Sequence, residues 1–223
     1  SFSGTPNNGD IVQSIERGAY TGGNFFFQPN VGGDNLLVTN DDDNWNLIGN
    51  PYPSAINAVN FLGASANSNI TGAVYLWTHG TDIGAGNPDP FYEDYAYNYN
   101  VADYLVYNSS GPSVQNGFSG NIGAGQGFFV LMTDAASTNE TVTFENTMRS
   151  STYANNQFYR TNSEPNGDTS RIWLDFISPS GKTNTTLVAY IDGATNGEDR
   201  MFDAVTTNGN GLNLYSMLEN KTY

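Results

Sequence analysis

The stretch W-N-L-I-G-N-P-Y-P-S-A-I, from Trp45 to Ile56, is the most informative part of the chain for its fold. A short apolar strand stops there at an Asn-Pro turn, because Pro51 and Pro53 have a fixed φ and no N–H to donate to a neighbouring strand. The first proline also pushes Asn50 toward an extended conformation. No side chain in the stretch indicates catalysis, so we interpret it as a turn that shapes a β-rich fold.

Similar short runs extend from this turn toward both ends of the chain. Apolar or alternating segments bounded by Gly, Asn, Asp and Pro recur, whereas a helical period is rare. The pattern is typical of an all-β protein, and the number of runs favours an antiparallel, jelly-roll-like β-sandwich. The expected strands are Ile11–Ile15, Phe25–Gln28, Leu36–Thr39, Trp45–Gly49, Ala73–Thr78, Tyr104–Tyr107, Gly127–Thr133, Thr141–Glu145, Gln157–Arg160, Arg171–Ile177, Thr186–Ile191 and Leu212–Ser216.

One short helix is expected directly after the Asn-Pro turn. Ser54 is a suitable N-cap, and Gly63 is a suitable end. Between these two residues, Ile56, Val59 and Leu62 fall on one face of a helix. We expect this helix to cover one end of a sheet.

The clearest alternation lies in R-I-W-L-D-F-I, residues 171–177. Successive side chains of a strand point to opposite faces, so Ile172, Leu174 and Phe176 share one face and Trp173 lies on the other. We expect Trp173 to meet a partly covered surface.

We interpret residues 1–223 as a single β-sandwich module. A polar stretch at 162–170 separates two strand-rich halves, so a division there into two small β subdomains is the alternative. Because the composition does not change across this stretch, a long loop within one sandwich explains it as well as a linker does.

The charge of the chain excludes several classes of partner. Only 7 Lys and Arg stand against 22 Asp and Glu, which gives a formal net charge of -15. This charge would repel phosphate backbones and anionic lipid surfaces, so nucleic acid and acidic membranes are poor partners. No apolar run approaches the roughly 20 residues of a membrane-spanning helix. The absence of cysteine excludes disulfides, thiolate nucleophiles and zinc–thiolate sites.

Acidic loops supply the oxygen ligands that Ca²⁺ prefers, which are carboxylates, Asn side chains and loop carbonyls. One cluster lies just before the strand that begins at Trp45, and a denser cluster follows the strand that ends near residue 191. Neither matches an EF-hand loop, and a solvated acidic loop is the alternative for each. The expected calcium ligands are Asp41, Asp43, Asp192, Asn196, Asp199 and Asp203.

Aromatic residues among Asn and Asp indicate carbohydrate binding as another function, because sugar rings stack on exposed aromatic faces. Tyrosines also fill sandwich cores with their hydroxyls hydrogen-bonded, so packing is the alternative interpretation. The expected sugar-binding residues are Trp77, Tyr92, Tyr95, Tyr97 and Tyr99.

Catalysis has little support in the sequence. The only histidine is His79, and no G-x-S-x-G turn accompanies it, so a Ser-His-acid triad is not indicated. Glycoside hydrolysis would need two carboxyl groups about 5 to 10 Å apart, and nothing in the sequence selects such a pair. We therefore expect a protein without enzyme activity.

Several segments occur in an order that resembles a known family. They are F-S-G-T-P-N-N-G-D-I (2–11), W-N-L-I-G-N-P-Y-P-S-A-I (45–56), V-Y-L-W-T-H (74–79), G-A-G-Q-G-F-F-V (123–130), F-E-N-T-M-R (144–149), R-I-W-L-D-F (171–176) and G-A-T-N-G-E-D-R-M-F-D-A (193–204). Together they resemble the β-rich module that precedes the C-terminal sorting domain in many Bacteroidetes proteins exported by the type IX secretion system. The resemblance implies an extracellular or cell-surface location and supplies no catalytic residues. The sorting domain itself is missing, so we expect a fragment or a processed product.

The expected function is that of a noncatalytic structural or adhesive module in a secreted bacterial cell-surface protein. Its expected partners are other domains of that protein, copies of itself, or glycans, without nucleic acid and without membrane insertion. A carbohydrate-binding module and a self-assembling subunit of an extracellular fibre are the two alternatives. Ca²⁺ is the one cofactor that the sequence indicates.

Overall fold

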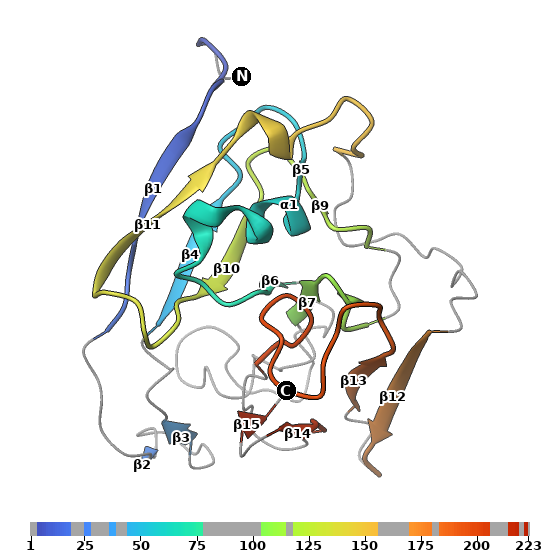
Figure 1. The fold of residues 1–223 in the computed structure, drawn as a ribbon. Helices are drawn as coiled ribbons and strands as arrows, with labels where there is room; N and C mark the ends of the chain where they lie inside the picture. Colours follow the sequence, from blue (N-terminus) through green and yellow to red (C-terminus); the bar gives the residue numbers. More distant parts are fainter. Residues whose placement is uncertain are drawn as a thin grey trace, which may run out of the picture.

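The computed structural model describes residues 4–18, 25–27, 36–38, 44–77, 104–114, 118–155, 170–179, 183–205, 214–218 and 221–222. These residues form an all-β fold with antiparallel sheets and one short α-helix, which confirms the expected fold class (Figure 1).

The elements follow one another in two runs along the chain. The first run is β1 (Ile11–Glu16), β2 (Phe25–Phe27), β3 (Leu36–Val38), β4 (Trp45–Gly49), β5 (Ile56–Asn57), α1 (Ala58–Gly63), the 3-10 turn η1 (Ser65–Asn67), β6 (Val74–Trp77), β7 (Tyr104–Asn108), β8 (Gly111–Pro112) and β9 (Asn121–Ile122). The second run is β10 (Gly127–Leu131), β11 (Asn139–Phe144), the 3-10 turn η3 (Asn146–Met148), β12 (Arg171–Ile177), β13 (Thr183–Ala189), β14 (Met217–Leu218) and β15 (Lys221–Thr222).

The largest sheet has the strand order β4-β10-β6-β7-β8 and is called the main sheet below. Two-stranded ribbons surround it, in which β1 pairs with β11, β5 with β9, and β12 with β13. In Figure 1 the β1–β11 ribbon lies to one side of α1 and of the main sheet, and the β12–β13 hairpin lies beyond β7. The main sheet and the β1–β11 ribbon are the two layers of the sandwich.

Phe61 of α1 connects these two layers. Its side chain is fully buried, and its ring stacks on Phe144 of β11 with a centroid distance of 4.9 Å. The same ring meets Phe128 of β10 edge-on at 5.5 Å. Full burial of an aromatic side chain contributes about 1.5 to 3 kcal/mol, so this contact is a major part of the core.

The opposite face of the main sheet carries a second, smaller apolar cluster. Tyr75 of β6 is buried there, and its ring meets Trp45 of β4 edge-on at a centroid distance of 4.6 Å. The Tyr75 hydroxyl donates a hydrogen bond to the carbonyl oxygen of Val205 at 2.9 Å. The main sheet therefore has apolar packing on both faces.

Asn50 fixes the Asn-Pro turn. Its N–H donates to the carbonyl oxygen of Gln126 at 3.0 Å, and its own carbonyl oxygen accepts from the N–H of Gly125 at 3.1 Å. Its buried side-chain amide donates to the carbonyl oxygens of Ser54 at 2.9 Å and Ile122 at 3.0 Å. Because buried polar groups need such partners, the loop before β10 and the Asn-Pro turn stabilise each other.

The helix begins later than the sequence predicts. Strand β5 occupies the expected first turn, and α1 starts at Ala58 with Asn57 as its N-cap, whose Oδ1 accepts from the N–H of Asn60 at 3.0 Å. The Ser54 hydroxyl instead accepts a hydrogen bond from Nε of Arg149 at 2.8 Å. The predicted N-cap was wrong because a residue distant in the sequence uses that hydroxyl.

Most predicted strands are present with small shifts of their ends. Strands β4 and β12 have the predicted bounds, whereas β13 begins and ends earlier than the predicted 186–191. The strand expected at 212–216 was wrong for its described residues, since Leu214 donates its N–H to the side chain of Asn184 and the strand β14 comes after it. The strand expected at 157–160 and the dividing stretch at 162–169 lie outside the described residues.

Arg200 holds the segment 191–205 against the end of α1. Its guanidinium donates to the carbonyl oxygens of Leu62 at 3.1 Å, Asn67 at 2.9 Å and Ile70 at 2.9 Å. Burial lowers the pKa of Arg200, although these carbonyl groups solvate its charge. Gly72 permits the close approach, because a Cβ there would overlap the backbone of Arg200.

Candidate functional site

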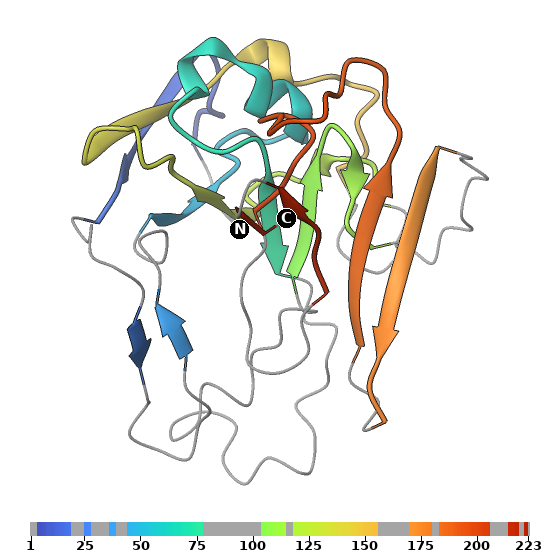
Figure 2. The same cartoon turned by 60° about the horizontal axis from the view of Figure 1, so that its bottom comes forward.

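The β12–β13 hairpin lies beside the β7–β8 edge of the main sheet without pairing to it (Figure 2). Two β12 side chains connect the hairpin to that edge. Nε of Arg171 donates to the carbonyl oxygen of Ser110, and Nε1 of Trp173 donates to that of Pro112 at 3.1 Å. Trp173 therefore lies on a partly covered face, as the alternation predicts.

The other face of the hairpin is apolar and exposed. Ile172, Leu174 and Phe176 are 49%, 47% and 48% exposed. Val188 lies directly opposite Ile172 and is 38% exposed, and Tyr190, just after β13, is 75% exposed. Directly opposed residues of an antiparallel pair share one face, so these five residues form a continuous surface, called the apolar hairpin face below.

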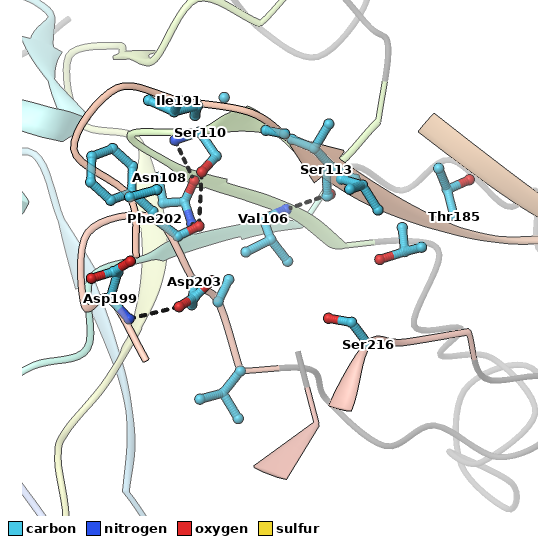
Figure 3. A pocket seen from close by; sticks show the side chains of 18 of the residues that line it. Val106, Asn108, Ser110, Ser113, Thr185, Ile191, Asp199, Phe202, Asp203 and Ser216 are labelled. Carbon is cyan, nitrogen blue, oxygen red and sulfur yellow. Dashed lines mark hydrogen bonds between the residues drawn. The ribbon is translucent and has the colours of Figure 1, made fainter. Parts of the chain in front are cut away.

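A cavity of about 320 Å³ lies between the hairpin, the β7–β8 edge and the segment 191–205 (Figure 3). Strand β13 lines it with consecutive residues, from Asn184 to Ala189. Asp199 and Asp203 lie in its wall, and among the described residues no Lys or Arg does. The cavity therefore suits neutral or basic groups better than anions.

The β7 side of the cavity is a fixed network of hydrogen bonds (Figure 3). Nδ2 of Asn108 donates to the carbonyl oxygen of Phe202 at 2.7 Å, and Oδ1 of Asn108 accepts from the N–H of Ser110 at 2.8 Å. The Ser110 hydroxyl donates to the same Phe202 carbonyl at 2.8 Å. Ser113 accepts the N–H of Val106 at 3.0 Å. Satisfied networks of this kind rigidify the wall.

The two wall carboxylates hold the loop 191–205 together. Asp199 accepts the N–H of Thr195 and, at 3.1 Å, the hydroxyl of Thr195. Asp203 accepts the N–H of Asp199 at 2.7 Å, as Figure 3 shows. These bonds fix the turn that carries Arg200, so the acidic cluster has a structural role.

The expected calcium ligands are only partly brought together. Asp192 and Asn196 are exposed and do not line the cavity that Asp199 and Asp203 line. Within the part of the chain that the structure describes, no three His, Cys, Asp or Glu side chains gather as a metal site would require. The two other expected ligands, Asp41 and Asp43, lie outside the described residues, so calcium there stays a prediction.

Of the expected sugar-binding residues, Trp77 is the one that the structure describes. It ends β6, is 45% exposed, and lies directly opposite Tyr104 of β7, which lines the cavity. The other four, together with His79, lie outside the described residues, and they are Tyr92, Tyr95, Tyr97 and Tyr99.

The sequence did not reveal the cavity. Its walls come from β7 and β8, from β13, and from the segment 191–205, and no local pattern links these regions. Asn108, Ser110 and Ser113 had no distinguishing signal, because Asn and Ser are common throughout the chain.

Comparison with protein families identifies the chain. A family model described as "Domain of unknown function (DUF8693)" matches residues 1–223, so the chain belongs to this family. No curated protein matches the chain, and no solved structure matches it. In the described parts of the chain, no helix has the length and apolar character needed to cross a membrane.

Proposed function

We propose that this member of the DUF8693 family is a noncatalytic structural or adhesive module of a secreted bacterial cell-surface protein. The apolar hairpin face is its attachment surface, and the partner is another domain of the same surface protein. The resemblance of the sequence to extracellular modules supports this location.

The exposure of the apolar hairpin face is the observation that carries the proposal. Single apolar residues on a surface are ordinary, whereas contiguous exposed apolar patches mark contacts with other proteins. Here Leu174 and Phe176 lie on one strand beside Ile172, and Val188 continues the same face on the next strand. The chain as a whole is strongly acidic, so apolar contact is a more effective means of attachment than charge pairing between like modules.

Site-specific photo-crosslinking tests the proposal in cells that produce the protein. Phe176 is replaced with p-benzoylphenylalanine, and the adducts are identified by mass spectrometry. We expect adducts with a neighbouring domain of the same surface protein. Val12 on β1 is the matched control, because it is also apolar and is 62% exposed, but lies far from the hairpin in the fold. Equal adduct yields at the two positions, or none at Phe176, would contradict the proposal.

Carbohydrate binding is the second candidate function, and the exposed ring of Trp77 beside Tyr104 favours it. The test is a thermal melt of the chain with a panel of soluble polysaccharides, since a ligand that prefers the folded state raises its apparent stability. A rise in Tm that Trp77→Ala removes would support this function. An unchanged Tm throughout the panel would argue against it.

A further inference from the structure

Strand β13 has one edge without a partner strand. It belongs to a two-stranded sheet with β12, and among the described residues no other strand pairs with it. Hydrogen-bonded and non-hydrogen-bonded pairs alternate along an antiparallel ladder. The N–H of Tyr190 donates to the carbonyl oxygen of Ser170 at 2.8 Å, which sets the phase of the ladder.

This phase decides which backbone groups of β13 face outward. Pairs at even positions, such as Val188 with Ile172, exchange hydrogen bonds like the pair of Tyr190 and Ser170. The N–H and C=O groups of Thr185, Leu187 and Ala189 therefore point away from β12. They form a regular row of donors and acceptors along the unpaired edge.

The cavity runs along this edge. Successive side chains of a strand point to opposite faces, so a cavity lined by six consecutive residues, Asn184 to Ala189, follows the edge and not one face. At a rise of about 3.4 Å per residue, this stretch is roughly 17 Å long. Its opposite wall is the network of Asn108, Ser110 and Ser113, which holds its shape through its own hydrogen bonds.

The two edges of the hairpin differ in how they are protected. Edge strands commonly carry charges, Pro or bulges that prevent unwanted pairing. Strand β12 contains Arg171 and Asp175, whereas β13 has the sequence T-N-T-T-L-V-A with no charge, Pro or Gly. The β13 edge is thus suited to pairing, and β12 is the protected one.

We propose that this β13 edge binds an extended, neutral or basic peptide segment by strand addition within the cavity. Main-chain hydrogen bonds to Thr185, Leu187 and Ala189 give the binding energy, as in other cases of strand addition. Asp199 and Asp203 in the wall, with no Lys or Arg beside them among the described residues, exclude acidic segments. The inference rests on the proposed attachment function and names the kind of segment through which the chain attaches.

The experiment measures amide hydrogen exchange by NMR in the full 223-residue chain. The probe is the peptide Ac-KTVTVTK-NH2, and its acidic counterpart Ac-ETVTVTE-NH2 is the control. At a concentration ten times the Kd of the basic peptide, exchange at Thr185, Leu187 and Ala189 should slow by about tenfold. The acidic peptide should have a much smaller effect. No slowing at these three amides would overturn the proposal, as would equal slowing by both peptides.

Ala189→Pro is the matching change in the protein. Proline removes the outward N–H without removing a bond to β12, and such prolines are tolerated on edge strands. Ala189→Ser keeps the N–H and is the control. We expect peptide binding to be lost in the first variant and kept in the second, with both folded by circular dichroism. If the proline variant bound as tightly as the serine variant, strand addition would be excluded.

These results separate the two proposals. Adducts at Phe176 without slowed exchange at Leu187 would retain the attachment function and reject strand addition. Slowed exchange without adducts at Phe176 would leave the edge as a peptide site and reject the apolar hairpin face as the attachment surface.

Discussion

The core around Phe61 and the β12–β13 hairpin use the same kind of sequence with opposite results. In the core, apolar residues of β10 and β11 close on Phe61 and are fully buried. In the hairpin, Ile172, Leu174 and Phe176 alternate just as regularly, and about half of each side chain stays exposed. An alternating pattern therefore shows which residues share a face, but it does not show what covers that face.

The largest expected effect tests the core side of this comparison. Phe61→Ala should lower the free energy of unfolding by about 3 to 5 kcal/mol, because it removes buried ring contacts and leaves a cavity. Urea unfolding followed by circular dichroism measures the change. A loss below about 1 kcal/mol would mean that the two layers do not depend on this ring.

The next effect concerns the segment 191–205, which joins the core to the hairpin side of the fold. Arg200→Ala should cost about 2 to 3 kcal/mol, because hydrogen bonds of a charged donor are lost and the carbonyl groups at the end of α1 lose their partners. The same unfolding measurement checks this value. Arg200→Lys is the control, and we expect it to restore only part of the loss, since an ammonium group lacks the fork geometry of a guanidinium.

A smaller, pH-dependent effect is expected at Tyr52, whose hydroxyl lies 2.7 Å from the carbonyl oxygen of Gly9 and 2.8 Å from that of Phe144. Burial, and then the charge of Asp10, raises the pKa of Tyr52 above its ordinary value of 10.0, although the charge of Arg149 lowers it. A raised pKa in the folded state gives stability that is present below pH 10.0 and is lost as pH rises through the folded value.

Tyr52→Phe should therefore cost about 1 kcal/mol near pH 7 and flatten the loss of stability above pH 10. Unfolding in urea at pH 8 and pH 11 compares the two proteins. Parallel losses in the wild type and the variant would show that other groups cause the alkaline loss, among them Tyr107, whose pKa burial also raises.

The smallest effect tests the hairpin side of the comparison. Phe176→Thr should change the unfolding free energy of the isolated chain by less than about 0.5 kcal/mol, because Phe176 is half exposed and surface substitutions have small effects. A loss near that of Phe61→Ala would show that the apolar hairpin face is packed within the chain. That result would remove the basis for an attachment surface.

Local sequence patterns predicted the strands well where the signal is local. Strands β4 and β12 have their predicted bounds, because a proline turn ends the first and strict alternation marks the second. The N-cap was not predictable in the same way. Ser54 and Asn57 both suit a cap, and the choice between them depends on Arg149, which binds the Ser54 hydroxyl from far along the chain.

The candidate site was less predictable for the same reason. Its walls combine three distant segments, and the residues that line it carry no chemistry that separates them from other Asn, Ser and Thr residues. The acidic cluster at Asp199 and Asp203 was visible in the sequence. Its role as the hydrogen-bonded frame of a loop became clear only from the partners of its carboxylates.

The hydrogen bonds of Arg200 also bear on how this family tolerates mutation. The guanidinium recognises main-chain oxygens of Leu62, Asn67 and Ile70, and every amino acid offers such an oxygen. Sequence drift at the two apolar positions can therefore proceed while this joint is preserved. The constraint falls instead on Arg200 itself and on Gly72, where any side chain would collide with the incoming backbone. In divergent relatives, we expect this Gly and Arg to persist as a pair while their surroundings change.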